Sequence, residues 1–403
     1  MIPVAEALSR VLSAFSPLPA ELVALPDALG RVTAEDIHAR LSQPPASMSA
    51  MDGYAVRAED VAQAPAILRQ VGEVQAGSAF DGRIGPGETV RIFTGAPLPD
   101  GADSVVIQED TEAEGNRITV LQAGVRHRHV RFAGIDFQAG QIGVPAGKLL
   151  TARDVGLAAA MNVPWIRVHR RPRIAILATG NEVVLPGDPV GSNQIVSSNA
   201  FALSALVTAF GGVPFNLGVA FDTPESLAEL TAGAWNADLL VTSGGASAGE
   251  YDLVRSVLGD RGMDLDFYKI AMRPGKPLMF GRLGDVPVLG LPGNPVSSYV
   301  CSVLFLRPAL LRMQGLDPTE TRLKARLGVP VKQNDQREDY MRATLSRSPA
   351  GELIAQPFES QDSSLVSVLA RADCLIVRPP FAPAASKDDI VEILPLTGGS
   401  FSL

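Results

Sequence analysis

Cysteine and histidine are scarce in this chain of 403 residues. It has two cysteines, Cys301 and Cys374, and four histidines. So few cysteines, placed so far apart, do not form a disulfide framework or a zinc cluster, and the histidines lack the short spacing of zinc ligands. The composition favours a reducing compartment, and we expect a cytoplasmic protein.

Basic residues are fewer than acidic residues. Lys and Arg number 35, against 43 Asp and Glu, which gives a net charge of −8 at pH 7. A protein that binds nucleic acid through its overall charge presents a basic surface. We therefore expect no nucleic-acid partner.

Long uninterrupted apolar runs are missing. Residues 189–221 and 286–306 carry no charge, but proline, glycine and asparagine interrupt both stretches. Neither offers the ~20 continuous apolar residues that a membrane span needs. The N-terminus lacks a basic region, and its apolar residues recur at the spacing of an amphipathic helix rather than of a signal peptide. We expect no membrane partner.

The chain contains a series of segments that differ in their predicted secondary structure. Its length suggests two to four domains. Residues 1–43 read as helical, 44–138 and 321–403 hold short β-like runs, and 139–170 hold a helix and a strand. Residues 171–320 alternate strand and helix, which predicts a parallel α/β layer with ligands at the carboxyl ends of its strands. The expected strands of this layer are 174–177, 213–219, 239–241 and 287–289, and the expected helices are 199–210, 224–234, 252–258 and 296–306.

The β-like runs lie on both sides of this layer. The expected strands are 71–74, 89–93, 104–108 and 118–121 in the first β segment, and 322–329, 341–345, 353–357, 374–377 and 390–394 in the last.

Three glycine-bearing loops follow predicted strands, at 178–182, 242–249 and 291–295, and a basic turn at 269–277 precedes the last of them. Glycine lets a ligand approach the backbone, and a helix N-terminus favours phosphate. The three loops together favour a phosphate-bearing ligand, although each alone is also explained as a tight turn. No Walker P-loop is present, and no G-x-G-x-x-G motif follows a strand.

Five acidic residues are candidates for binding a metal ion. Asp52, Asp136, Glu182, Asp222 and Asp252 lie in predicted loops. Acids beside a phosphate loop suit Mg²⁺, which takes one or two carboxylates together with substrate phosphates. Solvated loop acids and helix N-caps are the alternatives, and Asp222 is a good N-cap candidate.

A basic cluster spans residues 126–131. It suits the guidance of an anion into a cleft, or equally a solvated strand face.

Six stretches together resemble the molybdopterin molybdenumtransferase family, which includes bacterial MoeA and the E domain of gephyrin. They are residues 49–55, 92–103, 179–182, 243–249, 273–277 and 291–295. The resemblance covers nearly the whole chain.

The resemblance implies four domains: an elongated domain (1–43 and 139–170), an inserted β domain (44–138), an α/β domain like the molybdopterin adenylyltransferases (171–320) and a C-terminal β barrel (321–403). It implies a homodimer with a cleft between the α/β domain of one chain and the inserted domain of the other. The implied reaction inserts molybdate into adenylylated molybdopterin in the presence of Mg²⁺ and releases AMP. Molybdopterin adenylyltransferase and molybdoenzyme apo-proteins are the implied partners.

By motif, the resemblance also implies roles for individual residues. Acidic residues with catalytic roles would line the cleft: Asp52, Asp136, Glu182, Asp222 and Asp252, of which Asp222 and Asp252 would bind Mg²⁺. Substrate would contact Thr94, Thr179, Gly180, Ser243, Gly244, Gly245, Ser247, Gly293 and Asn294. Molybdate or phosphate would be held by Lys269, Arg273 and Lys276, and the barrel would contribute Arg342 and Ser363. The chain departs from the family pattern at Ile135, Asn181 and Arg273, where Glu, Asp and Lys are common.

Two other functions remain open at this stage. The α/β domain alone also suits transfer of a nucleotide from ATP to molybdopterin, and the gephyrin E domain has a second role as a partner-binding scaffold. Asp52 and Thr94, which lie outside the α/β domain, favour molybdenum insertion.

Overall fold

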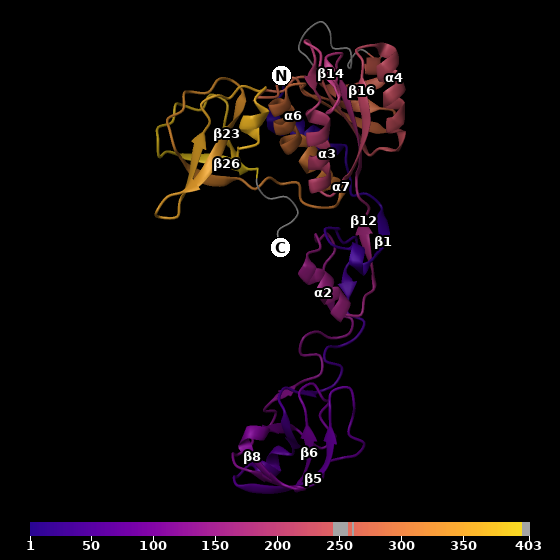
Figure 1. The fold of residues 1–403 in the computed structure, drawn as a ribbon, viewed down its shortest axis with the longest axis vertical. Coiled ribbons are helices and arrows are strands. Elements are labelled where there is room, and N and C mark those ends of the chain that lie inside the picture. Colours follow the sequence, from indigo (N-terminus) through magenta and orange to yellow (C-terminus); the bar gives the residue numbers. More distant parts are fainter. Residues whose placement is uncertain (245–256, 260–261, 397–403) are drawn as a thin grey trace.

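The computed structural model describes residues 1–244, 257–259 and 262–396. The molecule is elongated (Figure 1). The β domain (44–138) lies at one end, and the α/β domain (171–320) and the barrel domain (321–396) lie side by side at the other. A small linking domain, made of residues 20–43 and 139–170, joins the two ends.

A six-stranded sheet with the order β7-β4-β6-β5-β9-β8 forms the β domain. Apolar clusters cover both faces of this sheet. The four expected runs are confirmed, whereas β4 and β8 were not expected; the sequence of β8, Thr-Glu-Ala-Glu, is polar. The strands are β4 (Gly53–Val56), β5 (Ala66–Val74), β6 (Glu88–Ile92), β7 (Ser104–Ile107), β8 (Thr111–Glu114) and β9 (Arg117–Val120).

The linking domain corrects the expectation that residues 1–43 are helical. In this fully described segment the only α-helix is α1 (Val4–Ser13), and the rest forms short strands, 3-10 turns and loops. Prolines at positions 17, 19 and 26 explain the difference, because proline removes a helical hydrogen bond and clashes with the preceding turn. The linking strands are β1 (Ala20–Ala24), which pairs with β12 (Trp165–His169), and β2 (Ile37–His38), which pairs with β11 (Ile142–Val144).

Helix α2 (Ala152–Ala160) begins with a capping box formed by Thr151 and Asp154. The Asp154 carboxylate accepts the backbone N–H of Thr151 at 2.9 Å and the Thr151 hydroxyl at 2.7 Å. These bonds satisfy donors at the helix start, as expected of a Thr followed three residues later by an acid.

Helix α1 packs with the α/β domain and not with the linking domain to which the sequence assigned it. Val4, Ala7 and Val11 are buried in the same apolar cluster as the central strands of the α/β sheet. The chain therefore begins in the α/β domain, passes through the linking and β domains, and returns.

The α/β domain is a six-stranded sheet with the order β16-β13-β17-β21-β20-β18, covered on both faces. The four expected strands are confirmed and run parallel, while β20 and β18 extend one edge in antiparallel pairings that were not expected. The strands are β13 (Arg173–Thr179), β16 (Val213–Ala220), β17 (Leu239–Ser243), β18 (Met263–Phe267), β20 (Met279–Leu283) and β21 (Val286–Leu291). Helices α1, α3 (Asn199–Ala209), α6 (Pro295–Cys301) and α7 (Arg307–Met313) cover one face, and α4 (Pro224–Thr231) packs on the other.

Residues Pro295–Met313 form one helical stretch that is long and apolar enough for a membrane span. However, 78% of its most apolar window is buried inside the protein. Leu304, Phe305 and Leu310 belong to the core cluster beside the sheet. This stretch is therefore a core helix of the α/β domain.

The barrel domain closes on itself. Its strands pair in the order β23-β24-β22-β26-β25, and β25 pairs back with β23. All five expected strands are present: β22 (Leu323–Leu327), β23 (Glu338–Arg347), β24 (Leu353–Pro357), β25 (Cys374–Arg378) and β26 (Ile390–Pro395). The short strand β19 (Met272–Arg273) pairs with β23, so the basic turn of the α/β domain is fixed to the barrel.

Candidate functional site

A cavity of about 740 Å³ lies at the carboxyl ends of the parallel strands. All three predicted loops contribute to it, after β13, β17 and β21. The barrel adds Ser364 and Val366 to its lining. The structure thus brings together residues that are more than 180 positions apart, at the edge of the sheet where a parallel layer binds its ligands.

Asn199 organises the polar side of this cavity. Its amide nitrogen donates to the Ser243 hydroxyl at 2.7 Å and to the Gly293 carbonyl at 2.8 Å. One side chain at the start of α3 therefore joins the second and third loops. The sequence analysis missed Asn199, although an Asn at the start of a helix that follows two serines was a usable signal.

Gly244 allows the first two loops to touch. Its φ is +98°, and a Cβ at this position would lie 2.5 Å from the Thr179 carbonyl oxygen. No other residue type fits here without movement of the backbone. The Thr179 hydroxyl is buried beside Gly244 and has no hydrogen-bond partner among the described residues, so it is available to a ligand.

Glu182 and Asp222 follow neighbouring strands. Glu182 lines the cavity after β13, and its carboxylate lies over Gly180, whose Cβ would be 2.7 Å from a Glu182 oxygen. Asp222 follows β16, the partner strand of β13, and its backbone N–H donates to Asn181 at 3.0 Å. Both acids are exposed. Thr223, not Asp222, caps α4, because the Thr223 hydroxyl accepts the N–H of Ser226.

An apolar ribbon forms one wall of the cavity. It consists of β14 (Val183–Val184), β15 (Ile195–Val196) and the residues between them, and we call it the β14–β15 ribbon. Val183, Ile195 and Val196 line the cavity, and Ile195 is 59% exposed. The N–H of Ile195 donates to the Glu182 carbonyl at 2.8 Å, so the ribbon and the acidic loop are joined. Sequence analysis did not identify this wall.

Ser363 joins the barrel to the third loop of the cavity. The Asn294 side chain donates to the Ser363 hydroxyl at 2.8 Å, and the Val296 N–H donates to the Ser363 carbonyl at 3.1 Å. Asn294 occupies the N-cap position of α6, but its side chain bonds to the barrel and not to the helix.

Arg342 is buried, which the sequence did not predict. The side chain is 1% exposed, and it donates to the carbonyls of Asp362 at 2.9 Å and Leu365 at 3.4 Å. Burial lowers the pKa of the guanidinium. Arg342 therefore supports the loop that carries Ser363, and the expected direct contact with substrate is not possible in this conformation.

The basic turn is stiff, but its cations differ. Arg273 is occupied by Asp339, Asp335 and Asn334 of the barrel domain, and the Asp339 bond raises the pKa of its guanidinium. Lys269 is half-buried over the Tyr268 ring. Lys276 is exposed, forms no ion pair with any described residue, and lines a neighbouring cavity of about 320 Å³ beside Asp335.

Gly275 holds this turn against the core. Its φ is +108°, and a Cβ there would lie 2.5 Å from the sulfur of Cys301. Cys301 is fully buried, and burial raises the pKa of its thiol, so the side chain is a neutral packing group. The sequence analysis assigned no role to this contact.

Asp52 and Thr94 lie in the β domain. In one chain this domain is at the opposite end of the molecule from the cavity (Figure 1). Asp52 accepts the Thr94 N–H at 2.7 Å and the Thr94 hydroxyl at 2.8 Å, and the backbone bond lowers the pKa of the Asp52 carboxyl. Asp136 is exposed near the junction with the linking domain. One chain does not bring these three residues to the cavity. Three further predicted site residues, Gly245, Ser247 and Asp252, lie outside the described residues.

Three protein-family models match successive parts of the chain. Residues 2–162 match the MoeA N-terminal region (domains I and II), 175–312 a probable molybdopterin binding domain, and 324–396 the MoeA C-terminal region (domain IV). A molybdopterin molybdenumtransferase of Haemophilus influenzae is 32% identical over 400 residues, which cover 98% of each chain. The chain belongs to the MoeA family of molybdopterin molybdenumtransferases.

Other MoeA relatives agree. The Nostoc molybdopterin molybdenumtransferase is 40% identical over 304 residues, 73% of this chain and 70% of its own length. The crystal structure of a MoeA protein from Pyrococcus horikoshii is 33% identical, with a TM-score of 0.89 over 99% of this chain and 100% of its own. The family resemblance and the fold class predicted from the sequence are thus confirmed.

Proposed function

We propose that this protein inserts molybdate into adenylylated molybdopterin and releases AMP. The observation that carries the proposal is the cavity where the loops after β13, β17 and β21 meet the Ser363 loop of the barrel. Gly244 and the unpartnered Thr179 hydroxyl suit a phosphate group, and the apolar β14–β15 ribbon suits a planar ring. Family membership supports the same reaction, because the relatives are named for molybdenum transfer to molybdopterin.

Molybdate, the second substrate, is a small dianion. Lys276 is exposed and has no ion-pair partner within the described part of the chain, and the basic turn reaches the cavity through Pro277. Pro274 and Pro277 restrict the turn, so little ordering is needed when an oxyanion binds. We assign Lys276 to molybdate. Arg273 holds the turn to the barrel domain.

The acidic residues fit Mg²⁺ in part. The described residues contain no group of three or more His, Cys, Asp or Glu side chains that would form an all-protein site. Mg²⁺ needs only one or two carboxylates when phosphates supply the other oxygens, and Glu182 and Asp222 lie at the ends of adjacent strands. Asp222 would hold the ion together with the substrate phosphates. The bound Mg²⁺ would there neutralise negative charge on the pyrophosphate link.

The complete site requires a second copy of the chain. Asp52 and Thr94 form a preorganised pair in the β domain, and this domain lies at the opposite end of the molecule from the α/β domain and its cavity (Figure 1). In a homodimer, the β domain of one chain would bring this pair to the cavity of the other. We further propose a cytoplasmic location, with molybdopterin adenylyltransferase and molybdoenzyme apo-proteins as partners.

The test is to incubate the protein with adenylylated molybdopterin, with and without molybdate, and to measure AMP and protein-bound molybdenum. We expect AMP release that depends on molybdate, with one molybdenum incorporated for each AMP. Formation of adenylylated molybdopterin from ATP and molybdopterin would instead show the adenylyltransferase reaction. Nucleotide binding without turnover would favour the scaffold.

A further inference from the structure

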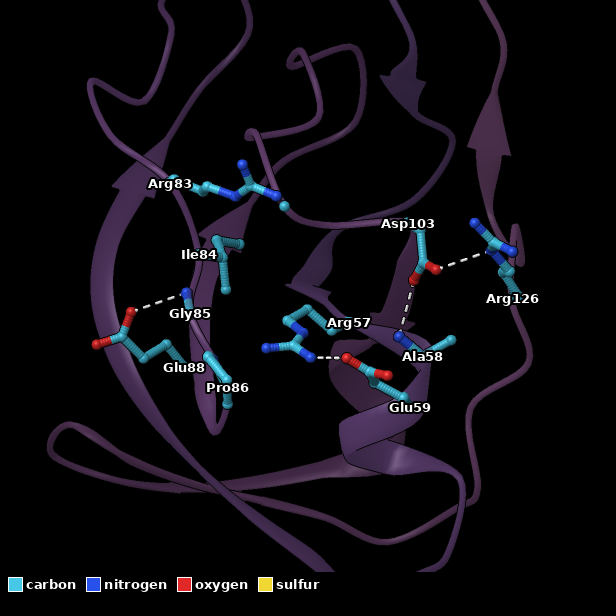
Figure 2. A pocket seen from close by; sticks show the side chains of 11 residues that line it. Arg57, Ala58, Glu59, Arg83, Ile84, Gly85, Pro86, Glu88, Asp103 and Arg126 are labelled. Carbon is cyan, nitrogen blue, oxygen red and sulfur yellow. Dashed lines mark hydrogen bonds and ion pairs between the residues drawn. The ribbon is translucent and has the colours of Figure 1, made fainter.

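A second cavity, of about 770 Å³, lies in the β domain (Figure 2). Its position relative to Asp52 and Thr94 follows from the strand directions. Asp52 precedes β4 and Thr94 follows β6, whereas this cavity is lined by Arg57, which follows β4, and Glu88, which begins β6. Because β4 and β6 are antiparallel, the cavity lies at the opposite end of the sheet from the Asp52–Thr94 pair. It is therefore separate from the insertion site.

Arginine side chains come to this cavity from three parts of the chain. Arg57, Arg83 and Arg126 all line it, as Figure 2 shows. Arg126 belongs to the basic cluster 126–131, to which the insertion reaction gives no role. Arg83 is exposed, and its guanidinium has no hydrogen-bond or ion-pair partner among the described residues.

Most acids around the cavity are occupied by backbone N–H groups. Asp103 accepts the N–H of Ala58 at 2.7 Å as well as Arg126 at 3.0 Å. Glu88 accepts the N–H of Gly85 at 3.0 Å, and this bond lowers the pKa of its carboxyl. These carboxylates hold the loops that shape the cavity, so their presence does not argue against an anionic ligand.

Glu59 is different. It pairs with Arg57, accepts no backbone N–H among the described residues, and its side chain is 68% exposed. An exposed ion pair contributes little free energy. An incoming anion can therefore replace Glu59 on Arg57 without disturbing the fold.

We propose that this cavity binds a tetrahedral oxyanion, either free or as the phosphate group of a small molecule, between the guanidinium groups of Arg57 and Arg83. Guanidinium presents a planar fork of N–H donors that matches such an oxyanion and stays charged at all physiological pH values. The volume is sufficient for a ligand of nucleotide size. The proposal stands independently of molybdenum insertion.

The test uses the full-length protein labelled with ¹⁵N, and follows the amide signals of Gly85 and Gly101, which line the cavity. Inorganic phosphate, molybdate and AMP are titrated separately, so the three arms distinguish a free oxyanion from a phosphate ester. We expect saturable shifts of both signals with at least one of these probes. Arg83→Ala should weaken that binding about tenfold or more, whereas Arg117→Ala, an exposed arginine on β9 outside the cavity, should not.

Glu59→Gln supplies the sharper test, because it removes the exposed one of the two carboxylates that pair with Arg57 and should tighten binding; the other, Asp60, lies 3.7 Å from Arg57 and is mostly buried. Glu112→Gln, on the exposed strand β8, changes the net charge equally and should leave the affinity unchanged. The proposal is overturned if no probe gives saturable shifts at Gly85 and Gly101, or if the two members of either variant pair behave alike. Since insertion is not measured, the result does not depend on the proposed function.

Discussion

Single residues decide which cations of the basic turn remain available. Arg273, Lys269 and Lys276 look equivalent in the sequence, where each is a basic residue next to a glycine-rich loop. The fold separates them, because Arg273 is paired with barrel carboxylates and Lys269 lies over an aromatic ring, while Lys276 forms no ion pair with any residue that the structure describes. The partners of Arg273 come from the barrel domain, more than 50 positions away, and cannot be read from local sequence.

Lys276→Ala should raise the molybdate concentration that gives a half-maximal insertion rate about ten- to a hundredfold, since it removes a charge-assisted contact. The affinity for AMP should change much less, because Gly244 and Thr179 line the larger cavity and Lys276 lines the neighbouring one. Lys387→Ala, an exposed lysine of the barrel domain, is the control. An unchanged half-saturation point for Lys276→Ala would refute the assignment to molybdate.

Asp222→Ala should lower the insertion rate about tenfold or more and raise the Mg²⁺ concentration needed for half-maximal rate, because it removes one of the few carboxylates near the phosphates. AMP should still bind, since the glycine loops are intact. Glu225→Ala, in the exposed first turn of α4, provides a matched loss of charge close by. Equal Mg²⁺ dependence in the two variants would exclude Asp222 as a ligand.

Whole elements determine the shape of the cavity. The sequence predicted the parallel strands and their loops, because buried strands read as short apolar runs between glycines. It did not predict the β14–β15 ribbon, whose four strand residues are too short a run to stand out, or the edge strands β18 and β20. It also read residues 14–43 as helical, although several prolines there argue against a helix. The type of an element could thus be predicted where its apolar pattern extends over several residues. It could not be predicted where the element forms only through pairing with a distant part of the chain.

The β14–β15 ribbon should contribute apolar contact to the ring of the ligand. Ile195→Ser should weaken AMP binding about five- to thirtyfold, which corresponds to ~1–2 kcal/mol for burial of a mostly exposed isoleucine. Val190→Ser is the matched control, because Val190 is 53% exposed in the same ribbon but does not line the cavity. Calorimetry with AMP would measure both. If Val190→Ser weakens binding as much as Ile195→Ser, the ribbon acts through its general stability and not as a wall.

At the scale of the whole molecule, the separation of Asp52 and Thr94 from the cavity is the dominant fact. The family resemblance implies that all these residues serve one reaction, and the β domain and the α/β domain lie at opposite ends of the elongated chain (Figure 1). Light scattering should therefore give about twice 42.4 kDa at micromolar concentration. A monomer with full activity would contradict a shared site.

The most direct test of this account is complementation between two inactive variants. Asp52→Ala damages the β-domain half of the site, and Gly244→Val damages the cavity, where a side chain would strike the Thr179 carbonyl. After the subunits of an equal mixture have exchanged, about half of the dimers are mixed, and each mixed dimer has one of its two sites intact. The account predicts recovery of about a quarter of the wild-type insertion rate, measured as molybdate-dependent AMP release. If the mixture stays inactive although mixed dimers are shown to form, insertion does not occur at a site that two chains share.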